Sequence, residues 1–300
     1  MDILSDYLKT FRLSAHVFLH SNFCGTWAVD TSGEDKATFH MIARGAAWLH
    51  LPEGSAPIAL RSGDVVVFPH DAIHTISNND TPPPPEQPRN QPSEATDEGP
   101  NTTLICGYFE FERHSWNPLL NALPDVMVIK SEDTANTALM DDIIRNIIYE
   151  TETEGAGSDV VIDKLSEVLF IHVVRTHMQQ QKTSTGFIAA LADKQISKAM
   201  SLFHAKPGDS WSVESLATNA GMSRSAFADK FHKLVNMTPI QYVTCWRMQL
   251  AHERLTTTKE SVTQVAEQSG YQSEAAFAKA FKKHFRFGPG AVRKKNNVPK

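Results

Sequence analysis

The sequence contains little cysteine and no long hydrophobic run. Its three cysteines, Cys24, Cys106 and Cys245, lie far apart and are odd in number. This argues against a disulfide framework and favours reduced thiols in the cytosol. No apolar stretch approaches the ~20 residues that span a bilayer, and the N-terminus lacks the basic region that opens a secretion signal. We therefore expect a cytoplasmic protein with no membrane partner.

Positive charge is scarce in the front of the chain. Residues 1–185 hold 12 Lys and Arg against 26 Asp and Glu, a net charge of −14, whereas residues 186–300 hold 17 against 8, a net charge of +9. The length of 300 residues is enough for two domains with separate cores. Two halves of opposite charge are expected to meet different partners, and the basic half favours a polyanion.

Residues 1–133 are predicted to form a β domain. Short runs such as "GAAWLHL", "DVVVF" and "TTLICGYFEF" are rich in β-branched and aromatic residues and are separated by Gly, Pro, Asp and Asn. Between them, residues 77–101 contain seven prolines and almost nothing apolar. We expect this segment to be a disordered insertion.

In residues 134–180 the spacing of the apolar residues changes to that of a helix. "ALMDDIIRNIIYE" places its isoleucines on one stripe, and "VVIDKLSEVLFIHVVRTH" does the same with Leu165, Val168, Leu169 and Val173. The break "TETEGAGS" turns the two helices into an antiparallel hairpin. Such a hairpin serves a domain's own packing as often as a homodimer interface, and the sequence leaves both open.

Residues 186–300 contain one motif twice. "AGMSRSAFADKFHKL" is followed about 50 residues later by "GYQSEAAFAKAFKKHF". In each copy a short helix leads to a turn glycine, Gly221 or Gly270, which permits a positive φ. Ser223 and Ser273 then stand where a second helix needs an N-cap. The pattern is typical of a helix-turn-helix.

A longer helix is predicted between the two copies, in "TPIQYVTCWRMQLAHERL". Thr238 with Gln241 has capping-box spacing, and Pro239 takes the first helical position. Ser261 with Gln264 has the same spacing before the second turn. A linker of roughly 16 residues spans about 24 Å.

The second helix of each copy is predicted to have one buried and one free face. Phe227 and Phe231, and likewise Phe277 and Phe281, recur at i and i+4 and should face the core. The opposite face carries small, polar and cationic residues, which fits a DNA major groove. An ordinary helical domain with a solvated basic face is the alternative. The duplication, the linker helix and the net charge together favour DNA binding.

Residues from about 190 to 293 resemble the DNA-binding domain of the AraC/XylS transcriptional regulators, above all in "VTQVAEQSGYQSEAAFAKAFKKHFRFGPGAVR". The resemblance implies two helix-turn-helix units on a shared linker helix, reading adjacent major-groove segments of double-stranded DNA. It implies base-facing positions at Ser225, Ala228 and Asp229 in the first recognition helix and at Glu274, Ala275, Ala278 and Lys279 in the second. It implies phosphate contacts from Arg224, Lys230, Lys233, Lys282 and Lys283.

The sequence departs from the family pattern in the charge of these positions. Asp229 stands where a cation or amide is common, and Glu274 is acidic as well. A carboxylate accepts a hydrogen bond from cytosine N4 but repels phosphate. The first unit is therefore expected either to read weakly or to read a cytosine. Val292 also replaces the tyrosine that is usual before Arg293.

"LRSGDVVVFPHDAIH" resembles the second motif of the cupin barrel, and "FHMIARG" stands where the first motif is expected. Cupin enzymes bind a metal through a His-x-His…Glu set and a later His, but the first motif here keeps only His40. A set of His40, His74 and Cys106, with His70 or Cys24 as a further ligand, would favour zinc. The alternative is that these side chains pack or hydrogen-bond inside a small-molecule pocket.

The expected fold class is α+β, with a cupin-like barrel and hairpin in front of an all-α domain with two helix-turn-helix units. The leading hypothesis is a non-enzymatic transcription factor that responds to a small effector. Activation is the more usual mode in the family and would make RNA polymerase a partner. The alternative is a metal-dependent cupin dioxygenase or isomerase with a basic helical tail, and a protein-binding scaffold is a third class that leaves the basic repeat unexplained.

Overall fold

The computed structural model divides the chain into two compact units, each built from separate segments. The sheet unit comprises Leu13–Phe111 and Leu123–Lys182, and the helical unit comprises Met1–Arg12, Glu112–Ala122 and Thr183–Lys300. The structure describes residues 3–52, 55–84, 86–87, 89–91, 101–111, 116–132, 137–153, 155–180 and 186–296. Within these ranges no helix combines the length and apolarity needed to cross a bilayer.

The units cut across the boundaries expected from the sequence. The segment 1–133 was expected to be one domain, but residues 1–12 and 112–122 group with the helical unit. The hairpin 134–180 was expected to stand apart, but it groups with the sheets. Both differences follow from tertiary packing, which local sequence patterns do not report.

Two antiparallel sheets form the sheet unit. The first has the order β1-β8-β3-β6-β9, with β1 (Ser14–Phe23), β8 (Thr102–Glu110), β3 (Ala37–Arg44), β6 (Val65–Phe68) and β9 (Met127–Ile129). The second has the order β2-β7-β4-β5, with β2 (Ala28–Val29), β7 (Thr75–Ser77), β4 (Ala46–His50) and β5 (Ile58–Arg61).

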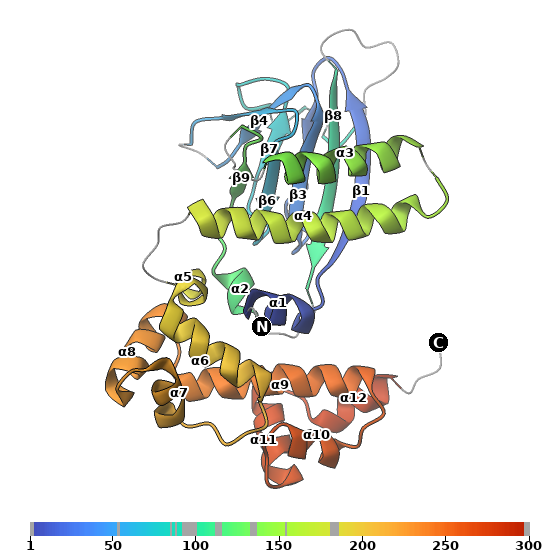
Figure 1. Cartoon of the computed structure of the whole chain (residues 1–300). Helices are drawn as coiled ribbons and strands as arrows, with labels where there is room; N and C mark the ends of the chain where they lie inside the picture. Colours follow the sequence, from blue (N-terminus) through green and yellow to red (C-terminus); the bar gives the residue numbers. More distant parts are fainter. Residues whose placement is uncertain are drawn as a thin grey trace. The chain divides into compact units, whose positions relative to one another are not determined.

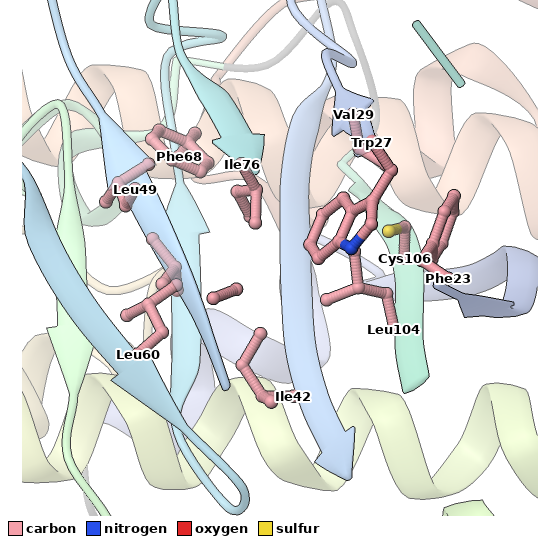
Figure 2. Close-up of a cluster of buried hydrophobic side chains, with 12 residues drawn as sticks. Phe23, Trp27, Val29, Ile42, Leu49, Leu60, Phe68, Ile76, Leu104 and Cys106 are labelled. Carbon is pink, nitrogen blue, oxygen red and sulfur yellow. The ribbon is translucent and has the colours of Figure 1, made fainter. Parts of the chain in front are cut away.

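The core of the sheet unit lies between the two sheets (Figure 2). Phe23, Ile42, Leu104 and Cys106 come from the first sheet, and residues such as Leu49 come from the second. Side chains alternate across a strand, so residues two apart on β3 or β8 share the inner face. This places Thr38 with His40 and Ile42, and it places Tyr108 with Cys106.

The hairpin covers the outer face of the five-stranded sheet (Figure 1). It consists of α3 (Thr137–Thr153) and α4 (Ser158–Gln180). Phe170 of α4 packs against Phe109 of β8 with ring centroids 4.7 Å apart. The predicted stripe of α4 is correct at Leu169 and Val173, which are buried, and wrong at Val168, which is 40% exposed. The buried stripe of α4 therefore includes Leu169 rather than Val168, and α4 packs against β1.

Part of the segment 77–101 is ordered, contrary to the prediction of a disordered insertion. Ser77 belongs to β7, and Arg89 and Asn90 both bond Asp30. These polar contacts anchor residues whose composition contains little apolar surface to bury. Residues 85, 88 and 92–100 lie outside the described residues.

The helical unit contains two helix-turn-helix pairs on a common long helix. Its elements are α1 (Ile3–Thr10), α2 (Pro118–Asn121), α5 (Phe187–Ala192), α6 (Lys194–Ala205), α7 (Val213–Ala220), α8 (Arg224–Val235), α9 (Pro239–Thr257), α10 (Val262–Gln268), α11 (Glu274–Phe285) and α12 (Pro289–Asn296). Helices α7 and α8 form the first pair, and α10 and α11 form the second. Helix α9 joins the two pairs (Figure 1).

The predicted caps and turns of the two pairs are confirmed. Gly221 and Gly270 have φ values of 68° and 78°. Ser223 accepts from the backbone N–H of Ala226, and Ser273 accepts from that of Ala276. The linker α9 begins with the predicted Thr238–Gln241 capping box and Pro239, and α10 begins with the Ser261–Gln264 box. Local rules therefore fix where these helices begin.

Candidate functional site

The recognition helices α8 and α11 expose the same positions. Along the two 12-residue helices, each residue of α8 has the same degree of burial as its counterpart 50 positions later in α11, except at Leu234 and His284. Phe227 and Phe231 are buried, as Phe277 and Phe281 are. Each helix is thus held on one side by an aromatic pair, and its other side is free.

Four predicted positions of α8 are exposed and open to a ligand. Ser225, Asp229 and Lys233 are exposed, and Ala228 is half-buried beside them. Arg224 at the first position is also exposed. The side chains that the family resemblance assigns to base reading therefore do lie on the free face of the helix.

Lys230 is the exception among the predicted phosphate contacts. Its ammonium lies 2.6 Å from the Asp193 carboxylate and donates to the Gln195 side chain at 3.1 Å. Asp193 is also the N-cap of α6, where it accepts from two backbone N–H groups. Lys230 therefore joins α8 to α6 and is less available to phosphate than the sequence indicated.

Helix α11 presents a more cationic face. Lys279, Lys282 and Lys283 are exposed, as is Ala275, and Ala278 is half-buried. The Glu274 carboxylate accepts a 2.6 Å bond from the Thr263 hydroxyl of α10. This bond orients the carboxylate at the first turn of α11, next to the exposed face.

The charges of the two recognition helices are exchanged at matching positions. Arg224 begins α8 where Glu274 begins α11, and Asp229 of α8 corresponds to Lys279 of α11. Acidic and basic side chains make different contacts with base edges. The two helices therefore present different surfaces in the same geometry.

The linker holds the two pairs through one continuous helix. Helix α9 has 19 residues, which at 1.5 Å each gives about 28 Å. Met248, Ala251 and Leu255 of α9 pack into the core of the second pair. Arg293, which follows the buried Val292, donates to the carbonyls of Thr258 and Glu260, which lie just after the end of α9. These contacts fix the second pair to the linker.

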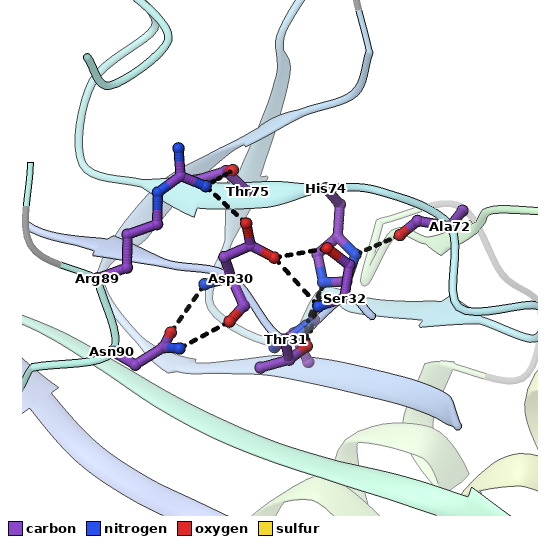
Figure 3. A network of polar contacts seen from close by, with 9 residues as sticks. Asp30, Thr31, Ser32, Ala72, His74, Thr75, Arg89 and Asn90 are labelled. Atoms are coloured by element: carbon purple, nitrogen blue, oxygen red, sulfur yellow. Dashed lines mark hydrogen bonds and ion pairs between the residues drawn. The ribbon is translucent and has the colours of Figure 1, made fainter. Parts of the chain in front are cut away.

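Inside the sheet unit, His40, His74 and Cys106 form a chain of hydrogen bonds (Figure 3 shows its outer end). His74 Nδ1 lies 2.7 Å from the Ala72 carbonyl, which can only accept, so Nδ1 carries the proton. His74 Nε2 then accepts from His40 Nε2 at 2.9 Å. His40 Nδ1 is left to accept from the Cys106 thiol at 3.0 Å.

Burial favours the neutral forms of these three hydrogen-bonded side chains. Burial lowers the pKa of His40 well below its ordinary value, and the neighbouring His74 lowers it further. Burial also lowers the pKa of His74 and raises that of the Cys106 thiol. Two imidazoles whose Nε2 atoms are 2.9 Å apart cannot both be protonated without strong repulsion.

The three residues do not fit a metal ion, although they were the predicted zinc ligands. His40 faces Cys106 with Nδ1 and His74 with Nε2, and one ring cannot direct both nitrogens at one ion. The predicted additional ligand His70 lies 3.1 Å from the Leu123 carbonyl instead. Among the residues that the structure describes, no group of three or more His, Cys, Asp or Glu is arranged to hold a metal.

A cavity of about 490 Å³ opens beside this chain of hydrogen bonds. Thr31 connects the two, because its hydroxyl lies 3.1 Å from His40 Nε2 and 3.2 Å from His74 Nε2. The cavity is lined by Phe18, Asp30, Thr31, Ser32, Glu34, Lys36, Thr38, Asn90 and Tyr108. The site thus combines an aromatic wall, hydroxyl groups and charged residues.

Sequence reasoning pointed to the histidines and missed the residues that line the cavity. Thr38 lies two positions before His40 on one strand, so alternation on a strand would have placed it on the same inner face. Asn90 gave no such signal, because it lies in the segment expected to be disordered. Its two bonds to the Asp30 backbone depend on tertiary packing.

Both halves of the chain match known protein families. Residues 2–179 match the family described as Cupin, and residues 216–295 match the Helix-turn-helix domain family. The HTH-type transcriptional regulator AlkR of Acinetobacter baylyi is 31% identical over 99% of this chain and 100% of its own length. A putative AraC-like transcription regulator of Streptomyces antibioticus is 30% identical over 98% of this chain and 99% of its own.

Two solved structures match the chain with low TM-scores. ToxT from Vibrio cholerae matches 97% of this chain and 100% of its own, with 12% identity and a TM-score of 0.39. The DNA-binding domain of AdpA, solved in complex with a target DNA, matches 34% of this chain and 92% of its own, with 28% identity and a TM-score of 0.33. The sequence matches are decisive: the chain belongs to the AraC-type helix-turn-helix transcriptional regulators that carry an N-terminal cupin domain.

Proposed function

We propose that this regulator binds a bipartite DNA site and changes transcription when a small effector occupies the sheet unit. The observation that carries the proposal is the matched exposure of α8 and α11 on one rigid linker. We further propose that it acts as an activator, with RNA polymerase as a partner, in the cytoplasm.

The proposed DNA contact uses one recognition helix in each of two successive major-groove segments. A major groove admits one α-helix, and both helices keep their aromatic face in the core. Base reading is assigned to Ser225 and Asp229 in the first helix and to Ala275 and Lys279 in the second. Phosphate contact is assigned to the exposed Lys233, Lys282 and Lys283.

The two halves of the DNA site are proposed to differ in sequence. Asp229 can accept from cytosine N4, whereas Lys279, at the matching position, can donate to guanine O6 and N7. Because one chain carries both helices, the site needs no internal symmetry.

The effector is proposed to enter the cavity beside His40 and His74. An effector changes the activity of the regulator only if it binds the active and inactive arrangements unequally. The wall of the cavity includes Asn90 and Asp30, which are joined by two hydrogen bonds. A ligand at this wall can therefore change how the segment around Asn90 is held.

We also propose that the hairpin pairs two copies of the chain. Leu139 and Tyr149 of α3 are 50% and 63% exposed, and Val161 and Val168 of α4 are 41% and 40% exposed. Burying such side chains against a second copy is favourable, at about 25 cal/mol per Å². Sedimentation of the wild type and of a Tyr149→Glu, Val168→Glu variant tests this, and a wild type that stays monomeric would refute the pairing.

Selection from random duplex DNA by the full-length chain tests the central proposal. We expect enrichment of two short sequence blocks about one helical turn apart, because the linker fixes the spacing of α8 and α11. The Lys279→Ala variant should lose the preference within one block only. Binding that weakens with salt but enriches no sequence would reduce the helical unit to a nonspecific basic surface.

A further inference from the structure

We propose that the cavity of the sheet unit binds a small organic carboxylate. Its carboxylate group would contact Lys36, and its apolar body would lie against Phe18 and Tyr108. This inference rests on the proposed effector response and specifies the chemistry of the effector. It follows from which polar groups of the cavity already have partners and which do not.

Asp30 and Asn90, which line one side of the cavity, already have partners within the protein. The Asp30 carboxylate is 2.6 Å from the Arg89 guanidinium and accepts from the backbone N–H and the hydroxyl of Ser32 (Figure 3). The Asn90 amide is also committed, because it accepts from the Asp30 backbone N–H and donates to the Asp30 carbonyl. These groups form part of the cavity wall, and few of their hydrogen-bonding positions remain free for a ligand.

Apart from the exposed carboxylate of Glu34, the uncommitted groups of the cavity are donors. Lys36 places its ammonium 3.6 Å from the centroid of the Tyr108 ring, and it forms no ion pair with any residue in the described part of the chain. The cation is half-buried and is held by the ring face alone, which stabilises it less than a carboxylate would. An anionic ligand would therefore gain a strong, charge-assisted hydrogen bond here.

Thr38 provides a second donor in the lining of the cavity. It is only 2% exposed, and its hydroxyl finds no hydrogen-bond partner among the described residues. Thr38 faces Tyr108 directly across the ladder between β3 and β8. A buried hydroxyl without a partner is costly, so a ligand that accepts a hydrogen bond from Thr38 would remove that cost.

The apolar wall of the cavity favours an apolar body on the part of the ligand that lies beyond its carboxylate. The rings of Phe18 and Tyr108 are stacked, with centroids 6.1 Å apart and an interplanar angle of 26°. Phe18 is 51% exposed, although it is a large aromatic residue. A flat or alkyl body that covers Phe18 would remove this surface from water. A cationic ligand would instead meet Lys36, and the carboxylate available to it, that of Glu34, is exposed.

Calorimetric titration of the full-length protein tests the assignment with matched probes. The probes are benzoate and hexanoate, their neutral amides benzamide and hexanamide, and the cation benzylamine. The variants are Lys36→Met, which removes the charge, Lys36→Arg, which keeps it, and Thr38→Val, which removes the hydroxyl at nearly constant shape. Lys164→Met, at an exposed lysine of α4 outside the cavity, is the control.

We expect at least one carboxylate to bind at least tenfold more tightly than its amide and than benzylamine. Lys36→Met should weaken that binding at least tenfold, Thr38→Val should weaken it severalfold, and Lys36→Arg and Lys164→Met should bind within about threefold of the wild type. Comparison of benzoate with hexanoate distinguishes a flat body from an alkyl body. If no probe binds, if amides or the amine bind as well, or if Lys36→Met binds like the wild type, the inference is wrong.

DNA binding measured on the same samples separates this inference from the proposed function. If the protein binds a bipartite site but no carboxylate, only the ligand class is refuted. If it binds a carboxylate but no DNA sequence specifically, the proposed DNA reading is refuted while the ligand site remains.

Discussion

The Tyr7 hydroxyl, near the start of the chain, donates a 2.9 Å hydrogen bond to the Tyr242 hydroxyl of the linker helix. Tyr242 in turn lies 2.7 Å from His204 Nε2, and His204 Nδ1 lies 3.3 Å from the Asp6 carboxylate. The bonds begin and end in α1, so they join α1 to α6 and α9. The N-terminal helix is therefore a structural part of the helical unit, and the chain passes from it directly into β1.

Truncating Tyr7 should destabilise the helical unit. Tyr7 is 1% exposed and contacts the rings of Phe11, Phe187 and Trp246. Loss of a fully buried aromatic side chain costs about 3–5 kcal/mol, so Tyr7→Ala should lower the free energy of unfolding by that amount. Tyr7→Phe removes only the hydroxyl bond and should cost about 1 kcal/mol. Urea unfolding followed by tryptophan fluorescence measures both, and equal small losses would show that α1 is not part of this core.

Lys279 and Lys283 should affect DNA binding in different ways. Lys279→Ala should cost about 1–3 kcal/mol and relax the preference at one base position, because Lys279 is assigned to a base edge. Lys283→Ala should weaken binding to all sequences alike and reduce the salt slope by about 1. Fluorescence anisotropy at several salt concentrations distinguishes them. Identical behaviour of the two variants would contradict the assignment of roles.

Lys230 and Lys233 offer a matched pair on α8. Lys230 is held by Asp193, whereas Lys233 is exposed. Lys233→Ala should reduce the salt slope of DNA binding by about 1, and Lys230→Ala should leave it near the wild-type value. Lys230→Ala should instead lower stability by less than about 1 kcal/mol, since the ion pair is partly exposed. A reduced salt slope in Lys230→Ala would mean that the lysine leaves Asp193 to bind phosphate.

The sheet unit should lose stability in mild acid. Burial, together with the neighbouring His74, holds the pKa of His40 well below its ordinary value. Below about pH 6.5 the unfolded chain therefore binds more protons than the folded chain, and stability present at neutral pH is lost as the pH falls. Between pH 7.5 and 5.5, we expect the free energy of unfolding of His40→Gln to fall by about 1 kcal/mol less than that of the wild type. Urea unfolding at the two pH values checks this, and parallel losses would refute it.

The helical unit could be predicted well from the sequence because its rules are local. Turn glycines such as Gly221 and capping residues such as Ser223 act within four residues of chain, and the structure confirms them. The repeat also shows the same pattern of turn glycine and capping serine twice in the sequence. The docking of Tyr7 was not predictable in this way, because it depends on contacts 235 residues apart in the chain.

The sheet unit was harder to predict because its site is assembled from separate strands. The residues His40, His74 and Cys106 were correctly expected to be neighbours, but the zinc interpretation was not supported by their geometry. Which nitrogen of His40 faces which partner depends on the register of β3 and β8. The sequence does not state that register, so it could not distinguish a metal site from a chain of hydrogen bonds.

The most direct test of the central claim varies the spacing of the two DNA blocks bound by the full-length protein. Because α9 holds α8 and α11 at a fixed separation, inserting five base pairs turns one block about half a helical turn away. We predict that this insertion weakens binding as much as replacing one block by random sequence. Affinity that is unchanged by the insertion would contradict a rigid linker and the joint reading of DNA by both helices.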